Sequence, residues 1–175
     1  MAFESKLDRG PAYQLGSVAL ILSVAAILTA LAFQYIGGDA PCPLGSMQRY
    51  AYYAAIPLLF VTLALSSAGR PGWAAALFFI VALAFLANAG LGVYHAGAEW
   101  KFWPGPDTCA GGQELSTSAG SLLKDLEGTR VVRCDEAALR ILGLSFAGWN
   151  VIASLALMSL ALRAAFASSE ARLNA

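Results

Sequence analysis

Four long stretches of the chain contain no aspartate, glutamate, lysine or arginine, and the charged residues lie between or beyond them. A helix needs about 20 mostly apolar residues to cross a bilayer, at about 1.5 Å of rise per residue. Each stretch is close to that length or longer. The stretches cover residues 12–38, 51–69, 71–98 and 141–162. The pattern therefore predicts four membrane-spanning helices.

The predicted helices form one antiparallel bundle. Arg70, Pro71 and Gly72 connect the second helix to the third, and so short a connection joins antiparallel neighbours. Because four spans use roughly half of the chain, no separate soluble domain of useful size remains. We predict an all-α membrane protein with a single domain over residues 1–175. Its helices are expected at about residues 13–36, 50–67, 73–94 and 141–163.

The first predicted helix is expected to be retained. Ala30, Leu31 and Ala32 have the small-residue spacing of a signal-peptide cleavage site. However, the apolar run before and around them exceeds the roughly 7 to 15 residues of a signal-peptide core. We therefore interpret this segment as a membrane helix.

The composition supports a membrane protein. Hydrophobic residues make up 58% of the chain and charged residues 13%, whereas a soluble domain carries about a quarter charged residues. The 11 basic and 11 acidic residues give a net charge of zero, with no basic cluster suited to nucleic-acid phosphates. Membrane lipid is the expected surrounding, and nucleic acid is not an expected partner.

All three cysteines fall in two loops on the same side of the predicted bundle. Cys42 lies in the loop at about residues 37–49, and Cys109 and Cys134 lie in the loop at about residues 95–140. The second loop has more than 40 residues, and loops of this length are usually functional. The count of basic residues does not decide the orientation. Disulfides persist in oxidising compartments, so we expect the cysteine loops in the periplasm or a similar extracytoplasmic space.

The residues alone leave the bonding of the cysteines open. With three cysteines, Cys42 is unpaired unless it bonds Cys109 or Cys134 and frees the other. A structural disulfide and a redox-active one both fit this pattern. A Cys₃His zinc site needs three cysteines and one histidine, and the chain has three cysteines and a single histidine, His95. Their spacings are not those of a zinc motif, so no metal is expected.

Several motifs together resemble the bacterial DsbB-type proteins that form disulfide bonds in membranes. The chain has four predicted helices and a cysteine before the second helix, followed by Gln48 and Arg49. A long loop bearing two more cysteines follows the third helix. The run at residues 90–100 and the segment from Cys134 to Leu144 are also similar to that family. The resemblance covers nearly the whole chain.

The resemblance implies a protein-thiol:quinone oxidoreductase of the bacterial inner membrane. Such a protein reoxidises a periplasmic DsbA-like partner with a thioredoxin fold and passes electrons to ubiquinone or menaquinone. Cys109 would be attacked by the partner's thiolate, with Cys134 as its bonded mate, and exchange with Cys42 would follow. Exchange requires exposed cysteines close to one another, because a thiolate must attack a sulfur in line.

The resemblance also implies two quinone-binding residues. Arg49 lies four residues after Gly45, about one helical turn, and would donate a hydrogen bond to a quinone oxygen. The alternative for Arg49 is an arginine that reaches to the lipid headgroups. His95 would donate to the second oxygen and deliver protons. The alternative for His95 is an interfacial histidine with a backbone partner.

One position departs from the family pattern. The family has a Cys-x-x-Cys pair in its first loop, and this chain has Gly45 in place of the second cysteine. Two hypotheses follow. The enzyme cycle is stalled at this step, or the chain is a non-catalytic four-helix subunit of a larger membrane complex that has kept the fold. A channel or transporter has no support, because no charged residues lie within the predicted spans.

Overall fold

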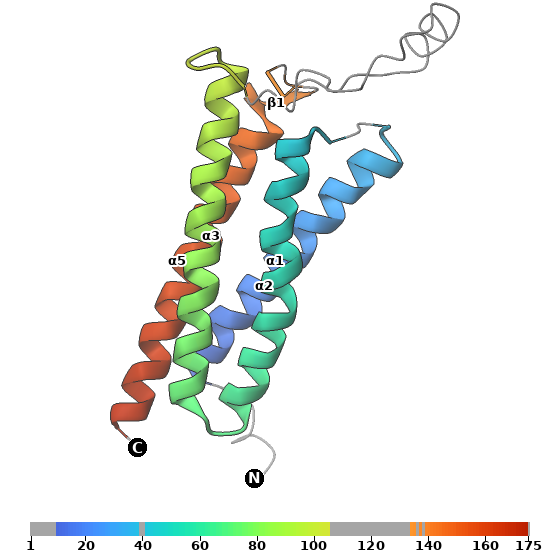
Figure 1. Cartoon of the computed structure of the whole chain (residues 1–175). Coiled ribbons are helices and arrows are strands. Elements are labelled where there is room, and N and C mark those ends of the chain that lie inside the picture. Colours follow the sequence, from blue (N-terminus) through green and yellow to red (C-terminus); the bar gives the residue numbers. More distant parts are fainter. Residues whose placement is uncertain (1–9, 39–40, 106–133, 136, 138, 175) are drawn as a thin grey trace, which may run out of the picture.

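The computed structural model describes residues 10–38, 41–105, 134–135, 137 and 139–174. It contains four long helices and one short antiparallel hairpin, shown in Figure 1. Each helix is long and apolar enough to cross a membrane, which confirms the predicted fold class. The helices are α1 (Pro11–Tyr35), α2 (Pro43–Ser67), α3 (Pro71–Glu99) and α5 (Phe146–Leu173), and the strands are β1 (Arg140–Ile141) and β2 (Leu144–Ser145).

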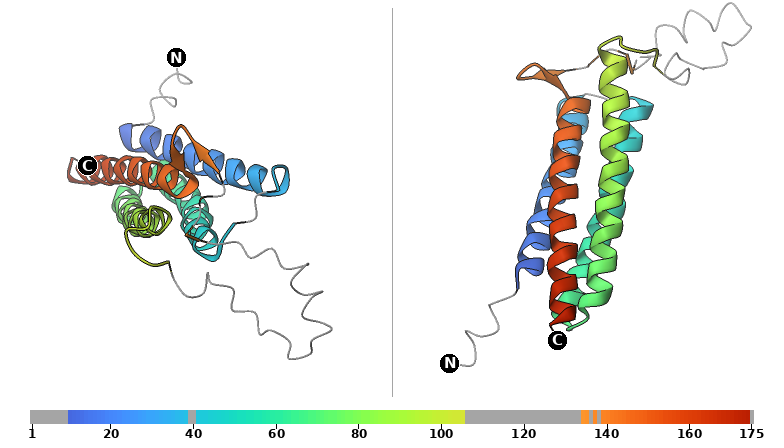
Figure 2. Two further views of the ribbon diagram at one scale, coloured as in Figure 1. Left: turned by 90° about the horizontal axis from the view of Figure 1, so that it is seen from above. Right: turned by 90° about the vertical axis from the view of Figure 1, so that its left-hand side faces the viewer.

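The helices lie side by side, and α3 packs most extensively against α5 (Figures 1 and 2). The end of α1, the start of α2, the end of α3 and the β1–β2 hairpin meet at one end of the bundle, which we call the cysteine end. The turn between α2 and α3 lies at the opposite end, together with the start of α1 and the end of α5.

The helix starts follow from local sequence. Pro11, Pro43 and Pro71 each stand at the first position of a helix, where the missing N–H costs nothing. Ser145 caps α5, and its hydroxyl oxygen accepts a hydrogen bond from the Gly148 amide at 3.2 Å. Cys42 has the same role for α2, because its Sγ accepts from the Gly45 amide at 3.4 Å.

Four helix boundaries differ from the prediction by more than two residues, and one of them is the end of the fourth helix, which lies at Leu173 rather than at about 163. The second helix begins at Pro43 rather than near residue 50, because Cys42 and Pro43 provide a cap and a helix start. The third continues past residue 94 to Glu99. The fourth begins at Phe146 rather than 141, because Leu142 and Gly143 have φ angles of 53° and 84° and form a hairpin turn. That conformation is incompatible with a right-handed helix.

Away from the cysteine end, the bundle is closely packed around large side chains. Phe78, Phe85 and Leu59 are fully buried, each with 0% exposure. Gly16 allows α1 to approach this core: a Cβ atom at Gly16 would lie 2.6 Å from Phe78 Cζ. The close contact requires glycine at this position.

Candidate functional site

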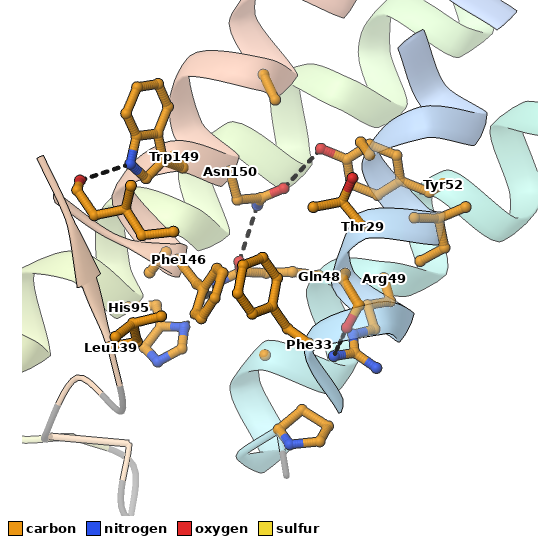
Figure 3. A pocket seen from close by; sticks show the side chains of 18 of the residues that line it. Thr29, Phe33, Gln48, Arg49, Tyr52, His95, Leu139, Phe146, Trp149 and Asn150 are labelled. Atoms are coloured by element: carbon orange, nitrogen blue, oxygen red, sulfur yellow. Dashed lines mark hydrogen bonds between the residues drawn. The ribbon is translucent and has the colours of Figure 1, made fainter. Parts of the chain in front are cut away.

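A cavity of about 630 Å³ opens at the cysteine end of the bundle. Its wall comes from α1, α2, α3, α5 and the hairpin, and most of it is apolar (Figure 3). Phe33 and Phe146 both line it and pack edge to face against each other, with ring centroids 4.9 Å apart. The cavity brings together Cys42, Gly45, Arg49 and His95, which the sequence analysis had singled out separately.

Cys42 is a buried free thiol at the edge of this cavity. Its side chain is 7% exposed, and its Sγ lies 3.5 Å from His95 Nε2. Burial raises the pKa of the Cys42 thiol, and the hydrogen bond from the Gly45 amide only partly opposes this. The neutral thiol is therefore the resting form, with an imidazole beside it.

His95 is oriented by a chain of buried amides. Gln48 Nε2 lies 2.9 Å from His95 Nδ1, and Asn150 Nδ2 donates to Gln48 Oε1 at 2.9 Å. Tyr52 in turn donates its hydroxyl proton to Asn150 Oδ1 at 2.8 Å (Figure 3). Asn88 Nδ2 donates to Asn150 Oδ1 at 3.3 Å. This network extends from the imidazole into the bundle and restricts the ring to one orientation.

Arg49 is half-buried on the α2 side of the cavity. Its guanidinium donates to Gln34 Oε1, and to the Ala30 carbonyl oxygen at 3.5 Å. Both acceptors belong to α1, so Arg49 links α1 to α2 where the two helices border the cavity. The guanidinium is thus held at the cavity wall by defined partners.

Glu99 also borders the cavity, and the sequence analysis did not single it out. It is 8% exposed, and its Oε1 lies 3.6 Å from His95 Nε2. Its position one turn after the only histidine was a usable signal, because residues four apart share a helix face. Gln48 was named only as part of the family motif, and Tyr52 and Asn150 were missed. A polar side chain inside an otherwise apolar span marks such residues.

Gly45 faces the cavity with space beside it. A Cβ atom there would lie 3.8 Å from Cys42 Sγ and 4.0 Å from His95 Cε1, which are ordinary van der Waals distances. The backbone therefore accommodates a side chain at the position where the family pattern has a cysteine.

Cys134 lies close to the first cysteine. Cys42, Leu44 and Cys134 form a small buried cluster against Leu91. Cys134 is disulfide-bonded and fully buried. Because Cys42 is buried as well, the expectation of exposed cysteines is wrong for these two residues, whereas the expectation that they lie close together is confirmed. Cys109, the predicted mate of Cys134, lies outside the described residues.

The segment that carries Cys134 is attached to the end of α3. Lys101 Nζ, just beyond α3, donates to Asp135 Oδ2 at 2.9 Å. Trp103 packs against the same end of α3, where a Cβ atom at Gly97 would lie 2.0 Å from Trp103 Cζ2. The Lys101–Asp135 ion pair therefore holds the end of the long loop at the end of α3.

A four-helix membrane bundle with a thiol, an imidazole and a neighbouring disulfide at one end of an apolar cavity defines a membrane protein of thiol–disulfide chemistry. The comparison with known families agrees. The family model described as "Disulfide bond formation protein DsbB" matches residues 13–164, which is most of the chain. The chain belongs to the DsbB family, and the family implies a thiol oxidoreductase that forms disulfide bonds at a membrane. No curated protein and no solved structure gave a match.

Proposed function

We propose that this protein is built to oxidise the thiols of a soluble DsbA-like partner and to pass the electrons to a membrane quinone held in the cavity, and that Gly45 stalls this cycle. The observation that carries the proposal is the placement of Cys42 Sγ 3.5 Å from His95 Nε2 at the edge of that cavity. We further propose that the cysteine end faces the periplasm, because a disulfide at Cys134 persists only in an oxidising compartment.

The cavity has properties that suit a quinone ring. Its volume of about 630 Å³ lies within the range of about 300–1,000 Å³ for small-molecule sites. Phe33 and Phe146 supply an apolar wall, and Arg49 and His95 supply polar groups for the ring oxygens. A bound quinone accepts two electrons and two protons. Arg49 would hold one oxygen, and His95 would hold the other and move a proton to it.

Electron transfer begins in the long loop. A thiolate of the partner attacks Cys109 of the proposed Cys109–Cys134 disulfide, and the Cys134 sulfur leaves as a thiolate. The second partner thiolate then displaces Cys109, so the partner is oxidised and the loop is reduced. The cluster of Cys42 with Cys134 supports the next exchange, because the two side chains belong to one buried group.

The glycine at position 45 interrupts this route. A first-loop pair needs two sulfurs to pass on two electrons as one disulfide, and only Cys42 is present. Cys42 can still form a mixed disulfide with a cysteine of the long loop, but no second first-loop sulfur is available to resolve it. We propose that the cycle stalls at this point.

The decisive experiment restores the missing sulfur. The Gly45→Cys variant is compared with the wild type for quinone reduction in the presence of a reduced DsbA-like protein. Gly45→Ser is the matched control, because it adds a side chain of similar size without a redox-active sulfur. Activity in Gly45→Cys alone supports the proposal. A folded Gly45→Cys variant with no activity towards a cognate partner would contradict it.

The lost cysteine also supports a second candidate, a non-catalytic subunit of a larger membrane complex. In that case the protein should copurify with a fixed set of membrane subunits, and replacing Cys109 and Cys134 should not change that set. However, several small residues of α3, which would allow close contact with another helix, are already buried within the bundle. Ala74, Ala82 and Ala89 are 0%, 3% and 4% exposed, respectively.

A further inference from the structure

The two ring nitrogens of His95 have different neighbours. Gln48 Nε2 lies 2.9 Å from His95 Nδ1, and Cys42 Sγ lies 3.5 Å from His95 Nε2, at the edge of the cavity. The hydrogen bond at one ring nitrogen decides which of the two carries the proton of a neutral imidazole. The orientation of the Gln48 amide therefore determines whether His95 offers a donor or an acceptor to the cavity.

Asn150 fixes the orientation of the Gln48 amide. Asn150 Nδ2 donates to Gln48 Oε1 at 2.9 Å, so the amino group of Gln48 is the end that faces His95 Nδ1 (Figure 3). An amide amino group can only donate, so Nδ1 accepts and the proton of the neutral ring is on Nε2. The neighbours of Nε2 agree with this assignment, because Cys42 Sγ at 3.5 Å and Glu99 Oε1 at 3.6 Å can both accept.

Two further donors orient Asn150 itself. Its Oδ1 accepts from the Tyr52 hydroxyl at 2.8 Å and from Asn88 Nδ2 at 3.3 Å. If Gln48 alone turned its carbonyl oxygen towards His95, the amino groups of Gln48 and Asn150 would face each other. If Asn150 turned as well, its amino group would face the amino group of Asn88. Buried donors without acceptors are costly, so the direction of the whole chain resists a change at any one member.

We propose that Gln48 and Asn150 are positioning residues that hold His95 in its Nε2–H tautomer, so that the imidazole presents a hydrogen-bond donor to Cys42 Sγ and the cavity. In this state His95 Nε2 does not accept the thiol proton of Cys42, because Nε2 already carries a proton. A donor there suits a thiolate or a quinone oxygen, since both accept. The use of this donor for quinone rests on the proposed function, but the tautomer does not.

The test is nitrogen-15 NMR of the purified protein in detergent micelles. His95 is the only histidine, so nitrogen-15-labelled histidine in protein without a histidine tag reports the two ring nitrogens of this residue alone. The spectrum is recorded at about pH 8, above the ordinary imidazole pKa of about 6.5. The Nε2–H tautomer should exceed the other by at least about tenfold. A wild-type ring protonated at Nδ1, or comparable amounts of the two tautomers, would show that the proposal is wrong.

Two substitutions should reverse the hydrogen bond at Nδ1. Gln48→Glu replaces the donor by a carboxylate that can only accept, so Nδ1 should carry a proton. Asn150→Asp acts one residue further from the ring. Its carboxylate cannot donate to Gln48 Oε1, so the Gln48 amide should turn and Nδ1 should again carry a proton. An unprotonated Nδ1 in either variant would overturn the role proposed for the residue that it replaces.

Ala153→Asp is the control for the added charge. Ala153 lines the same cavity from α5, and its methyl side chain takes no part in the chain of hydrogen bonds. The substitution adds the same carboxylate as Asn150→Asp and should leave Nδ1 unprotonated. If Nδ1 is protonated in Ala153→Asp as well, charge rather than hydrogen-bond direction sets the ring, and the proposal is wrong. The spectra need neither quinone nor partner, so this failure is separate from a failure of the proposed function.

Discussion

The two ends of the bundle are built in opposite ways. Away from the cysteine end, α3 presents Phe78 and Phe85 to a closely packed core, and both side chains are fully buried. At the cysteine end the same helix presents His95 and Glu99 to a cavity of about 630 Å³. A single helix therefore contributes to a closely packed core along most of its length and to a mostly apolar cavity with a few polar side chains at its end.

This difference indicates that the packed core provides most of the stability and that the cysteine end provides the chemistry. In a membrane, helices associate through close packing and a few hydrogen bonds, since lipid is as apolar as the core. In this protein the close packing surrounds Phe78, and the hydrogen bonds come from the chain of amides that includes Asn150. Four experiments test whether the core supplies the stability and the cysteine end supplies the chemistry, and they follow in order of decreasing effect.

The largest expected effect is the loss of a core aromatic ring. Phe78→Ala should lower the free energy of unfolding by about 2–4 kcal/mol, because the fully buried ring leaves a void. Phe146→Ala removes a ring that is 36% exposed and already borders the cavity, and should cost less than about 1 kcal/mol. Unfolding in detergent measures both. Equal losses of unfolding free energy in Phe78→Ala and Phe146→Ala would contradict the difference between the core and the cysteine end.

A smaller effect is expected from adding one methyl group to two glycines. Gly16→Ala places a Cβ atom 2.6 Å from Phe78 Cζ and should destabilise the protein by about 1–3 kcal/mol. Gly45→Ala meets nothing closer than 3.8 Å and should be neutral, or stabilise by up to about 1 kcal/mol through helix propensity. The same unfolding measurement compares them. A strongly destabilised Gly45→Ala would show that the space at position 45 is not usable.

Next in size is the loss of the amide network. Asn150→Ala removes the donor to Gln48 and the acceptor of Tyr52, and should cost about 0.6–2 kcal/mol. It should also slow quinone reduction in the Gly45→Cys background, because His95 loses its orientation. Asn174→Ala, at the exposed end of α5, is the matched control for stability. An unchanged rate would show that the network does not position the imidazole.

The smallest expected effect is on the pH dependence of stability. Burial raises the pKa of Cys42 in the folded protein, so the folded state holds its thiol proton more tightly than the unfolded state. The resulting stabilisation is complete below the ordinary cysteine pKa of about 8.5. This stabilisation is lost as the pH rises from the ordinary cysteine pKa through the raised pKa of Cys42 in the folded protein. When thermal unfolding is followed across alkaline pH, Cys42→Ala should not show this decrease in stability. Identical pH curves for the two proteins would contradict it.

Much of the architecture was predictable because charge exclusion from lipid is a local property of the sequence. The four charge-free stretches predicted four helices, and the structure confirms them. The boundaries at Pro43 and Phe146 were missed because capping by Cys42 and Ser145 depends on side-chain geometry that hydropathy does not report. Cys42, Arg49 and His95 were singled out through the family resemblance, and the structure places all three at one cavity.

The membrane class, the number of spans and the position of the cysteines between them follow from the amino-acid sequence, because each depends on runs of neighbouring residues. Which distant residues meet depends instead on how the helices pack against one another. Glu99 and His95 share one face of α3, but Cys42 joins them only through the packing of α2 on α3. Gln48 and Asn150, 102 positions apart, became one hydrogen-bonded pair in the same way. Hydropathy cannot encode such contacts, because they depend on the relative rotation and depth of the helices in the bundle.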